Sequence, residues 1–285
     1  VTARYLGKRM KGVVNVVVAF LLMAVGVSFV IGPSGLLQNL TGIDKSVWLY
    51  VIFGYYVLAT LLPVDKIIGS IYPYMGAILL FMALGVGVML IAGDLNGSHE
   101  MIELTPSVLK NWHADPESNV LFPMMFIVIS CGAISGFHST QSPVMARCMT
   151  NEKQSRSIFY GAMITESIIA LIWAAIAMAF WGGAQGLNEA IAQYGGSAAR
   201  MVNIISAETL GKCISPFVVV GVVACAITSG DTAFRSARLI IADFIGLSQK
   251  KFLNRAIICV PLFVAALVIL FCLPFQTMWS YFSWL

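Results

Sequence analysis

Long apolar runs separated by short polar segments dominate the sequence. Seven of these runs have the length and low charge that are typical of membrane-spanning helices. They cover residues 13–31, 46–62, 71–92, 120–136, 157–181, 214–230 and 256–273, and residues 277–285 have the pattern of the start of another helix. Each run is continuous rather than alternating, which excludes a transmembrane β-barrel. The pattern predicts an all-α polytopic membrane helical bundle that forms a single transmembrane domain over residues 1–285.

Composition supports this class. Apolar residues make up 59% of the chain and charged residues 11%, against about 45–50% and about 25% in soluble domains. The cysteines include no C-x-x-C pair and lie mostly within or beside apolar runs, so we expect packing residues and no disulfide framework or metal site. The chain opens without methionine and stops inside an apolar run, which predicts a piece of a larger membrane protein, truncated at both ends.

The basic residues gather in alternate connecting segments. With the N-terminus in the cytoplasm, 13 of the 17 lysines and arginines fall on the cytoplasmic side. This bias predicts a cytoplasmic N-terminal end. The predicted helices 120–136 and 214–230 then run in the same direction, and each ends in Ser-Gly followed by polar residues.

The first predicted helix is expected to end at the Gly32-Pro33 pair. A different glycine-rich polar stretch follows the run that begins at Val120. A single helix over residues 120–147 would be about 42 Å long, against a hydrocarbon core of about 30 Å. Gly132, Gly136 and Pro143 favour a break at membrane depth, which is typical of a transporter binding site. The alternative is a helix that ends near Gly136, with the polar residues in the cytoplasm.

The segment after helix 214–230 carries further candidate chemistry. That helix is expected to be short or to break near Thr228-Ser-Gly-Asp231. Alternatively, Asp231 caps a separate helix over 232–246 and pairs with Arg235 four residues later. Glu166, in the middle of helix 157–181, is an intramembrane carboxylate that serves either in proton coupling or in a hydrogen bond to a neighbouring helix.

Two stretches closely resemble the carbon starvation protein A (CstA) family of bacterial inner-membrane transporters. They are Gly132-Ala-Ile-Ser-Gly-Phe-His-Ser-Thr-Gln-Ser-Pro143 and Thr228-Ser-Gly-Asp-Thr-Ala-Phe-Arg-Ser-Ala-Arg-Leu-Ile-Ile-Ala-Asp243. The sequence Arg147-Cys-Met-Thr-Asn-Glu152 resembles the short-form members of that family. The resemblance implies secondary active uptake of peptides or pyruvate during starvation, coupled to H+ as the first candidate ion or Na+ as the second. It also implies a LeuT-like fold of the amino acid–polyamine–organocation superfamily.

The resemblance assigns expected roles to individual residues. The expected substrate-binding residues are Gly132, Ser135, Gly136, Phe137, His138, Ser139, Thr140 and Gln141. The expected ion- or proton-coupling residues are Glu166, Thr228, Ser229 and Asp231. The imidazole of His138 can bind a substrate carboxylate or carry a proton. The expected partners are a small-molecule substrate and the lipid bilayer, with no nucleic acid, no catalytic residue and no cofactor beyond the coupling ion.

Two other classes of function stay open. A membrane nutrient sensor would bind the same solutes without transporting them. An intramembrane hydrolase would use Ser139, His138 and Asp231, but the sequence has no G-x-S-x-G elbow, and a neighbouring Ser and His need not have nucleophile–base geometry. The sequence therefore favours a transporter over an enzyme.

Overall fold

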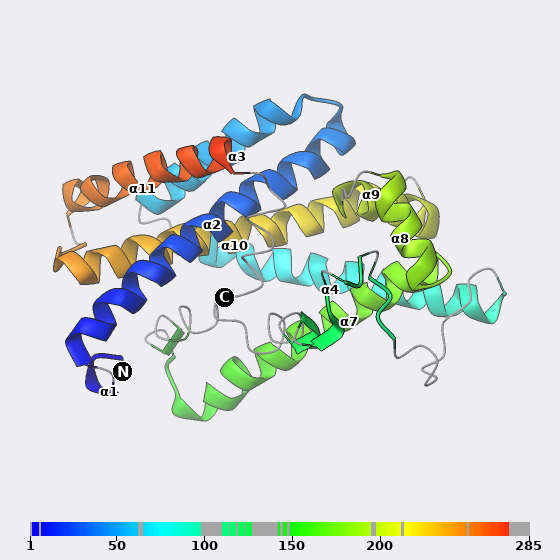
Figure 1. The fold of residues 1–285 in the computed structure, drawn as a ribbon, viewed down its shortest axis with the longest axis horizontal. Helices are drawn as coiled ribbons and strands as arrows, with labels where there is room; N and C mark the ends of the chain where they lie inside the picture. The colour runs from blue at the N-terminus through cyan, green and yellow to red at the C-terminus, as the bar shows by residue number, and fades with distance from the viewer. Residues whose placement is uncertain are drawn as a thin grey trace. The chain divides into compact units, whose positions relative to one another are not determined.

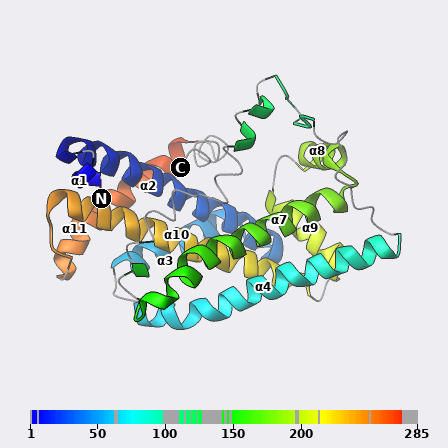
Figure 2. The same cartoon turned by 90° about the horizontal axis from the view of Figure 1, so that it is seen from below.

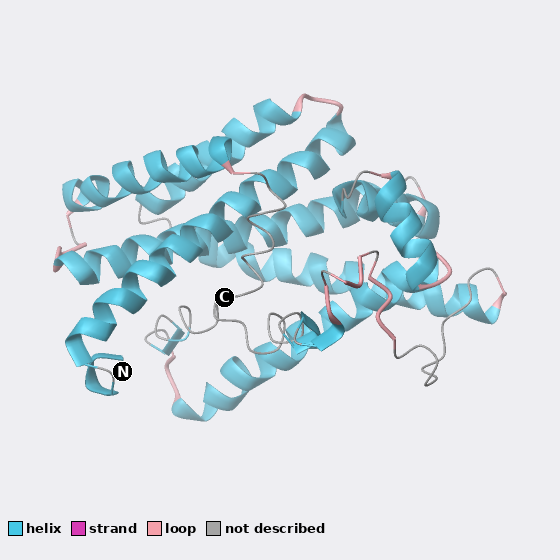
Figure 3. Cartoon of the chain, in the orientation of Figure 1, coloured by secondary structure: helices cyan, strands magenta, loops and turns pink. Residues whose placement is uncertain are grey.

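The chain folds into helices, as the apolar runs predict. The computed structural model describes residues 2–5, 7–61, 65–97, 110–113, 115–117, 119–122, 124–126, 142, 145–146, 149–194, 198–211, 214–249 and 251–273, and these residues include no β-strand (Figure 3). Among them, five helices are long and apolar enough to cross a membrane. They are Gly7–Thr41, Gly76–Leu95, Glu152–Phe180, Ser215–Ile245 and Phe252–Cys272. The protein is an all-α, multi-pass membrane protein.

The helices follow the apolar runs but differ from them at their ends. In chain order they are α1 (Thr2–Tyr5), α2 (Gly7–Thr41), α3 (Lys45–Leu61), α4 (Asp65–Leu95), the 3-10 turn η2 (Glu152–Gln154), the π-helical turn η3 (Arg156–Gly161), α7 (Ala162–Phe180), α8 (Ala184–Gln193), α9 (Ala198–Leu210), α10 (Ser215–Ile245) and α11 (Phe252–Cys272) (Figure 1). The predicted helix 120–136 falls largely outside the described residues, and the predicted start of a helix at 277–285 falls entirely outside them.

The prediction that the first helix ends at Gly32-Pro33 is wrong, because α2 continues to Thr41. Proline has no backbone N–H, so the Phe29 carbonyl, four residues earlier, loses its donor within the helix. The Tyr56 hydroxyl, on α3, donates to that carbonyl at 3.1 Å. Within a membrane helix a proline is tolerated where a neighbouring helix satisfies the freed group. A contact from another helix therefore allows α2 to pass its proline.

The chain divides into two compact units. The first contains Val1–Gln38, Gly42–Pro73 and Ala224–Leu285, and the second contains Asn39–Thr41 and Tyr74–Val223. Within the first unit, α3 packs along α11, and α2 lies against α10 (Figure 1). Its core holds the fully buried ring of Phe234, 4.8 Å from the ring of Phe263 and 5.5 Å from that of Tyr56. Aromatic packing thus joins α3, α10 and α11.

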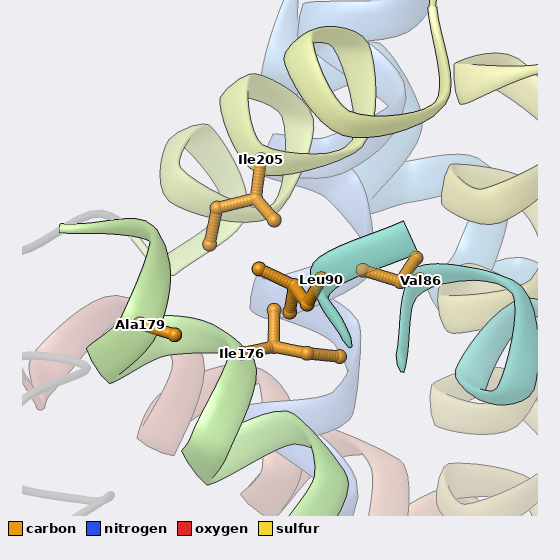
Figure 4. Packing of buried hydrophobic residues seen from close by; sticks show 5 residues of the cluster. All are labelled: Val86, Leu90, Ile176, Ala179 and Ile205. Carbon is orange, nitrogen blue, oxygen red and sulfur yellow. The ribbon is translucent and has the colours of Figure 1, made fainter. Parts of the chain in front are cut away.

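The second unit has an aliphatic core. Figure 2 shows α7 lying against α4, and Figure 4 shows the side chains that fill the contact. They are Val86 and Leu90 of α4, Ile176 and Ala179 of α7, and Ile205 of α9. All five are at most 5% exposed. Burial of an aliphatic side chain of this size contributes about 1.5–3 kcal/mol, so this cluster fixes the amphipathic helix α9 on the apolar helices.

Candidate functional site

Charged side chains lie on the inner side of α10, within the first unit. Asp231 is 1% exposed and Arg238 is 9% exposed. These residues occupy a helix that is long and apolar enough to cross a membrane. Because a charge within a membrane is costly, it generally has a partner and marks a functional site. The surroundings of Asp231 are therefore the strongest candidate site among the residues that the structure describes.

Asp231 forms an ion pair with Arg235 one turn later on the same helix. The Arg235 Nη2 donates to the Asp231 Oδ2 at 3.0 Å, and the arginine side chain is 22% exposed. The predicted i,i+4 pairing is confirmed. The prediction that Asp231 caps a separate helix is wrong, because Asp231 lies in the interior of α10. The ion pair gives the buried carboxylate a partly buried cation partner within hydrogen-bond distance.

The predicted break near Thr228 is absent from α10. The hydroxyls of Thr228 and Ser229 both donate to the Cys225 carbonyl, at 2.8 and 3.0 Å, and the Thr232 hydroxyl donates to the Thr228 carbonyl at 2.7 Å. Such bonds from a hydroxyl back to the preceding turn are compatible with a continuous helix. The backbone carbonyls therefore remain within the helix, and only the hydroxyl lone pairs are left to bind a cation.

Gly230 gives Tyr56 its close approach to α10. A Cβ added at position 230 would overlap the Tyr56 ring and hydroxyl. From this position the Tyr56 hydroxyl also lies 3.5 Å from the Ala226 carbonyl of α10, in addition to its shorter bond to α2. The pattern predicts that the Ser-Gly pair ends a helix, whereas Gly230 makes room for a tyrosine of α3.

Two arginines cap the C-terminal end of α3 by donating hydrogen bonds to its last carbonyls. The Arg238 Nη1 donates to the Thr60 carbonyl at 2.6 Å, and the Arg255 Nη1 donates to the Leu61 carbonyl at 3.2 Å. The last carbonyls of a helix lack intrahelical donors, and the helix dipole favours a cation at this end. Arg238 of α10 and Arg255 of α11 thus supply the donors that the last carbonyls of α3 lack.

The sequence predicts the pairing of Arg235 with Asp231 but does not place Arg238 in the site. The spacing of Arg238 from Asp231, at i+7, is the signal that could have found it. Residues at this spacing share one face of a helix. The three charged residues therefore form one stripe once α10 is recognised as continuous.

The other predicted site residues lie outside the first unit or outside the described residues. Glu166 lies on α7, in the second unit, and its side chain is exposed. The predicted substrate-binding residues lie outside the described residues; they are Gly132, Ser135, Gly136, Phe137, His138, Ser139, Thr140 and Gln141. The described residues contain no group of three or more His, Cys, Asp or Glu side chains that could hold a metal ion.

The chain is similar to known membrane proteins. Residues 2–216 match the family described as "Carbon starvation protein CstA". An uncharacterized membrane protein of Haemophilus influenzae is 38% identical over 238 residues, which are 66% of this chain and 63% of that protein. The "Peptide transporter CstA" of Mycobacterium tuberculosis is 36% identical over 129 residues, 44% of this chain and 16% of the relative.

A relative with a different printed substrate has similar identity. The "Pyruvate/proton symporter BtsT" of Escherichia coli is 34% identical over 126 residues, which are 43% of this chain and 17% of that protein. The chain therefore spans less than two thirds of the length of each of these curated relatives. The matches to the two transporters cover less than half of the chain.

Proposed function

The chain belongs to the carbon starvation protein CstA family, and we propose that it works as a secondary active transporter of the bacterial inner membrane. The proposed substrate is a peptide or pyruvate, which are small nutrients with a carboxylate group. The names of two relatives, a peptide transporter and a pyruvate/proton symporter, support this class of substrate. The observation that carries the proposal is the ion pair between the buried Asp231 and the partly buried Arg235.

The ion pair suggests how a proton and a substrate anion would be coupled. Before a proton and substrate bind, the carboxylate of Asp231 is paired with the guanidinium of Arg235. A proton taken up by Asp231 makes that carboxyl neutral and weakens its hold on the arginine. The arginine then binds the carboxylate of the substrate, for which its planar donors are well suited. The substrate replaces the lost negative charge, so proton and anion are bound together.

Other residues with expected roles in coupling and substrate binding belong to the same proposal. Thr228 and Ser229 supply hydroxyl oxygens for the alternative coupling ion, Na+. Glu166 is a second carboxylate available to a proton pathway. The residues from Gly132 to Gln141 contribute the rest of the substrate site, in a LeuT-like bundle with its N-terminal end in the cytoplasm. Substitution of Gly136 by leucine tests the role of that segment, and we expect it to abolish uptake while the protein stays in the membrane.

The experiment that tests the function is uptake into proteoliposomes. Labelled pyruvate and a labelled dipeptide are compared, with and without an inward proton gradient. Accumulation of one of them that requires the gradient would support the proposal. Binding without accumulation under any gradient would support a nutrient sensor instead, and uptake driven only by Na+ would assign the coupling to that ion.

The variant Asp231→Asn separates coupling from binding. Asparagine is neutral like a protonated aspartate, so Arg235 stays available to the substrate while the proton step is lost. We expect gradient-driven uptake to fall about tenfold or more, whereas substrate exchange is reduced less. Asp231→Glu, which keeps the titratable group, is the matched control. An equal loss of uptake and exchange in Asp231→Asn would reduce the residue to a structural partner of Arg235, and unchanged uptake would remove it from the mechanism.

A further inference from the structure

One exposed face of α2 carries an apolar stripe that begins beside an arginine. The stripe consists of Val13, Val16, Val17 and Phe20, and each of these side chains is at least 50% exposed. They follow Arg9 at i+4, i+7, i+8 and i+11, and residues at these spacings share one face of a helix. Arg9 is exposed as well. This face therefore presents a guanidinium at its N-terminal end and apolar side chains along the turns that follow.

The opposite side of α2 packs within the first unit. The Lys11 Nζ lies 2.6 Å from the Asp243 Oδ2 of α10. Leu22, at i+11 from this lysine and so on the same side of the helix, is fully buried. The face that begins at Arg9 is turned away from these contacts, and among the described residues it is open to whatever surrounds the helix (Figure 1).

The position of Arg9 along α2 matches the headgroup layer of a bilayer. The helix has 35 residues, a length of about 52 Å, so it extends beyond a hydrocarbon core of about 30 Å. Its apolar run begins at Val13, and Arg9 lies four residues earlier, about 6 Å along the axis. Each headgroup layer is about 5–8 Å thick. With Val13 at the edge of the core, the guanidinium lies at the depth of the lipid phosphates.

The charges near this arginine favour a headgroup with net negative charge. Arg4 and Lys8 are exposed at the same end of the chain, and residues 1–43 include no aspartate or glutamate. The carboxylate that faces this end from α10 is Asp243, which is already paired with Lys11. A guanidinium binds phosphate through two parallel donors, and basic residues beside a membrane-spanning segment attract anionic lipids.

We propose that this face of α2 binds an anionic phospholipid. Arg9 binds the phosphate, Arg4 and Lys8 favour the extra negative charge of the headgroup, and an acyl chain lies along the stripe from Val13 to Phe20. A free phosphate ester would contact only the cationic end, whereas a lipid uses the whole face. The inference rests neither on the proposed transport nor on the proposed orientation.

The test is native mass spectrometry of the purified full chain in detergent. The probes are dioleoylphosphatidylglycerol, dioleoylphosphatidylcholine and glycerol phosphate. We expect the anionic lipid to bind about fivefold or more tightly than the zwitterionic one, and glycerol phosphate at the same concentration not to displace it. Arg9→Gln should weaken phosphatidylglycerol binding about fivefold, the loss expected for one basic residue at an anionic surface, and should affect phosphatidylcholine less. Val17→Ser should weaken binding of both lipids, because it removes an apolar contact and no charge.

Lys45→Gln is the matched control, since it removes the same charge from the start of α3 in the same unit. It should leave phosphatidylglycerol binding unchanged, and Arg9→Lys, which keeps the charge, should retain part of the affinity. Thermal unfolding in detergent verifies that each variant is folded. Equal binding of the two lipids, an equal loss in Arg9→Gln and Lys45→Gln, or no loss in Arg9→Gln would overturn the proposal. Displacement of the lipid by glycerol phosphate would also overturn it and leave an adventitious ion only. An absence of transport would leave the result intact, because no substrate or gradient is used.

Discussion

The Tyr56 hydroxyl donates to the Phe29 carbonyl at 3.1 Å, at the point where Pro33 leaves α2 without its own donor. Tyr56 is fully buried, and its hydroxyl is also 3.5 Å from the Ala226 carbonyl. A single phenol thus compensates the proline of α2 and lies against α10. Three helices of the first unit meet at this residue.

This relationship predicts a coupling between Tyr56 and Pro33. Tyr56→Phe should lower the free energy of unfolding by about 1 kcal/mol, because the Phe29 carbonyl loses its donor. In a Pro33→Ala background the new N–H of residue 33 can satisfy that carbonyl, so the same substitution should cost less. Thermal unfolding of the four proteins in detergent measures this double-mutant cycle. Equal costs in both backgrounds would show that the hydroxyl does not compensate the proline.

Two glycines of the first unit should resist substitution by alanine, and a third should accept it. An alanine Cβ at position 26 would lie 2.6 Å from the buried Phe234 ring, and one at 230 would overlap Tyr56. Both variants should destabilise the protein by about 1–3 kcal/mol, as overpacking does. Gly54→Ala meets no atom within 4 Å and should stabilise α3 by about 0.5–1 kcal/mol. Thermal unfolding ranks the three variants, and an equal effect in all of them would contradict the packing described here.

The apolar runs were sufficient to predict an all-α membrane protein, because a stretch of about 20 apolar residues has few other stable forms. Helix ends were less predictable. Local rules predict that Pro33 and Gly230 end a helix, yet α2 and α10 continue through them. The Tyr56 hydroxyl donates to the carbonyl that Pro33 leaves without a donor, and the Tyr56 ring fills the space beside Gly230. Tyr56 lies 23 residues from Pro33 and 174 residues from Gly230 in the chain, and no pattern within a single segment reveals these relationships.

The candidate site was predictable to a similar degree. The i,i+4 pair of Asp231 and Arg235 could be read from spacing, because both residues lie on one helix face. The role of Arg238 could not, because its partner is the Thr60 carbonyl, 178 residues away in sequence. An arginine in a loop and an arginine buried on a helix cannot be told apart by residue type. Only the tertiary structure separates them here.

Removal of one partner of the α10 ion pair should destabilise the protein more than removal of both partners. Arg235→Gln alone leaves Asp231 buried beside a neutral side chain and should cost about 3 kcal/mol. The double variant Asp231→Asn with Arg235→Gln removes both charges and should be more stable than the single variant. Thermal unfolding in detergent gives the comparison. A double variant that is less stable than either single variant would indicate that the charges act independently.

Asp44 gives the first turn of α3 a dependence on pH. The Ser46 backbone N–H donates to the Asp44 Oδ1 at 2.7 Å, and this bond lowers the pKa of the carboxyl below its usual 3.8. Because the folded-state pKa is the lower one, the stabilising contribution is complete above pH 3.8 and is lost as the pH falls through the folded-state value.

Hydrogen exchange of the Ser46 amide should therefore accelerate in acid beyond its intrinsic change. Asp44→Asn keeps an oxygen acceptor but does not titrate, so the protection of this amide should vary less with pH. The exposed position of Asp44 confines the effect to the end of the helix. The same pH profile in both proteins would exclude the carboxylate as its cause.

The proposed orientation can be tested by labelling. In a background without native cysteines, a cysteine at Ser107 should react with a membrane-impermeant maleimide on intact cells, whereas one at Gln249 should be protected. The reason is the positive-inside bias, which assigns the basic connecting segments to the cytoplasm. After the cells are lysed, both positions should react. The reverse pattern on intact cells would place the N-terminus outside.

The capping of α3 by Arg238 and Arg255 has a consequence for the surrounding lipid. The helix has 17 residues, a length of about 26 Å, which is shorter than a hydrocarbon core of about 30 Å. Asp44 lies beside one end, and the two guanidinium groups lie at the other. Lipid accommodates such a mismatch by thinning around the short segment. The stability of the first unit should thus depend on acyl-chain length, with bilayers of shorter chains favouring the fold.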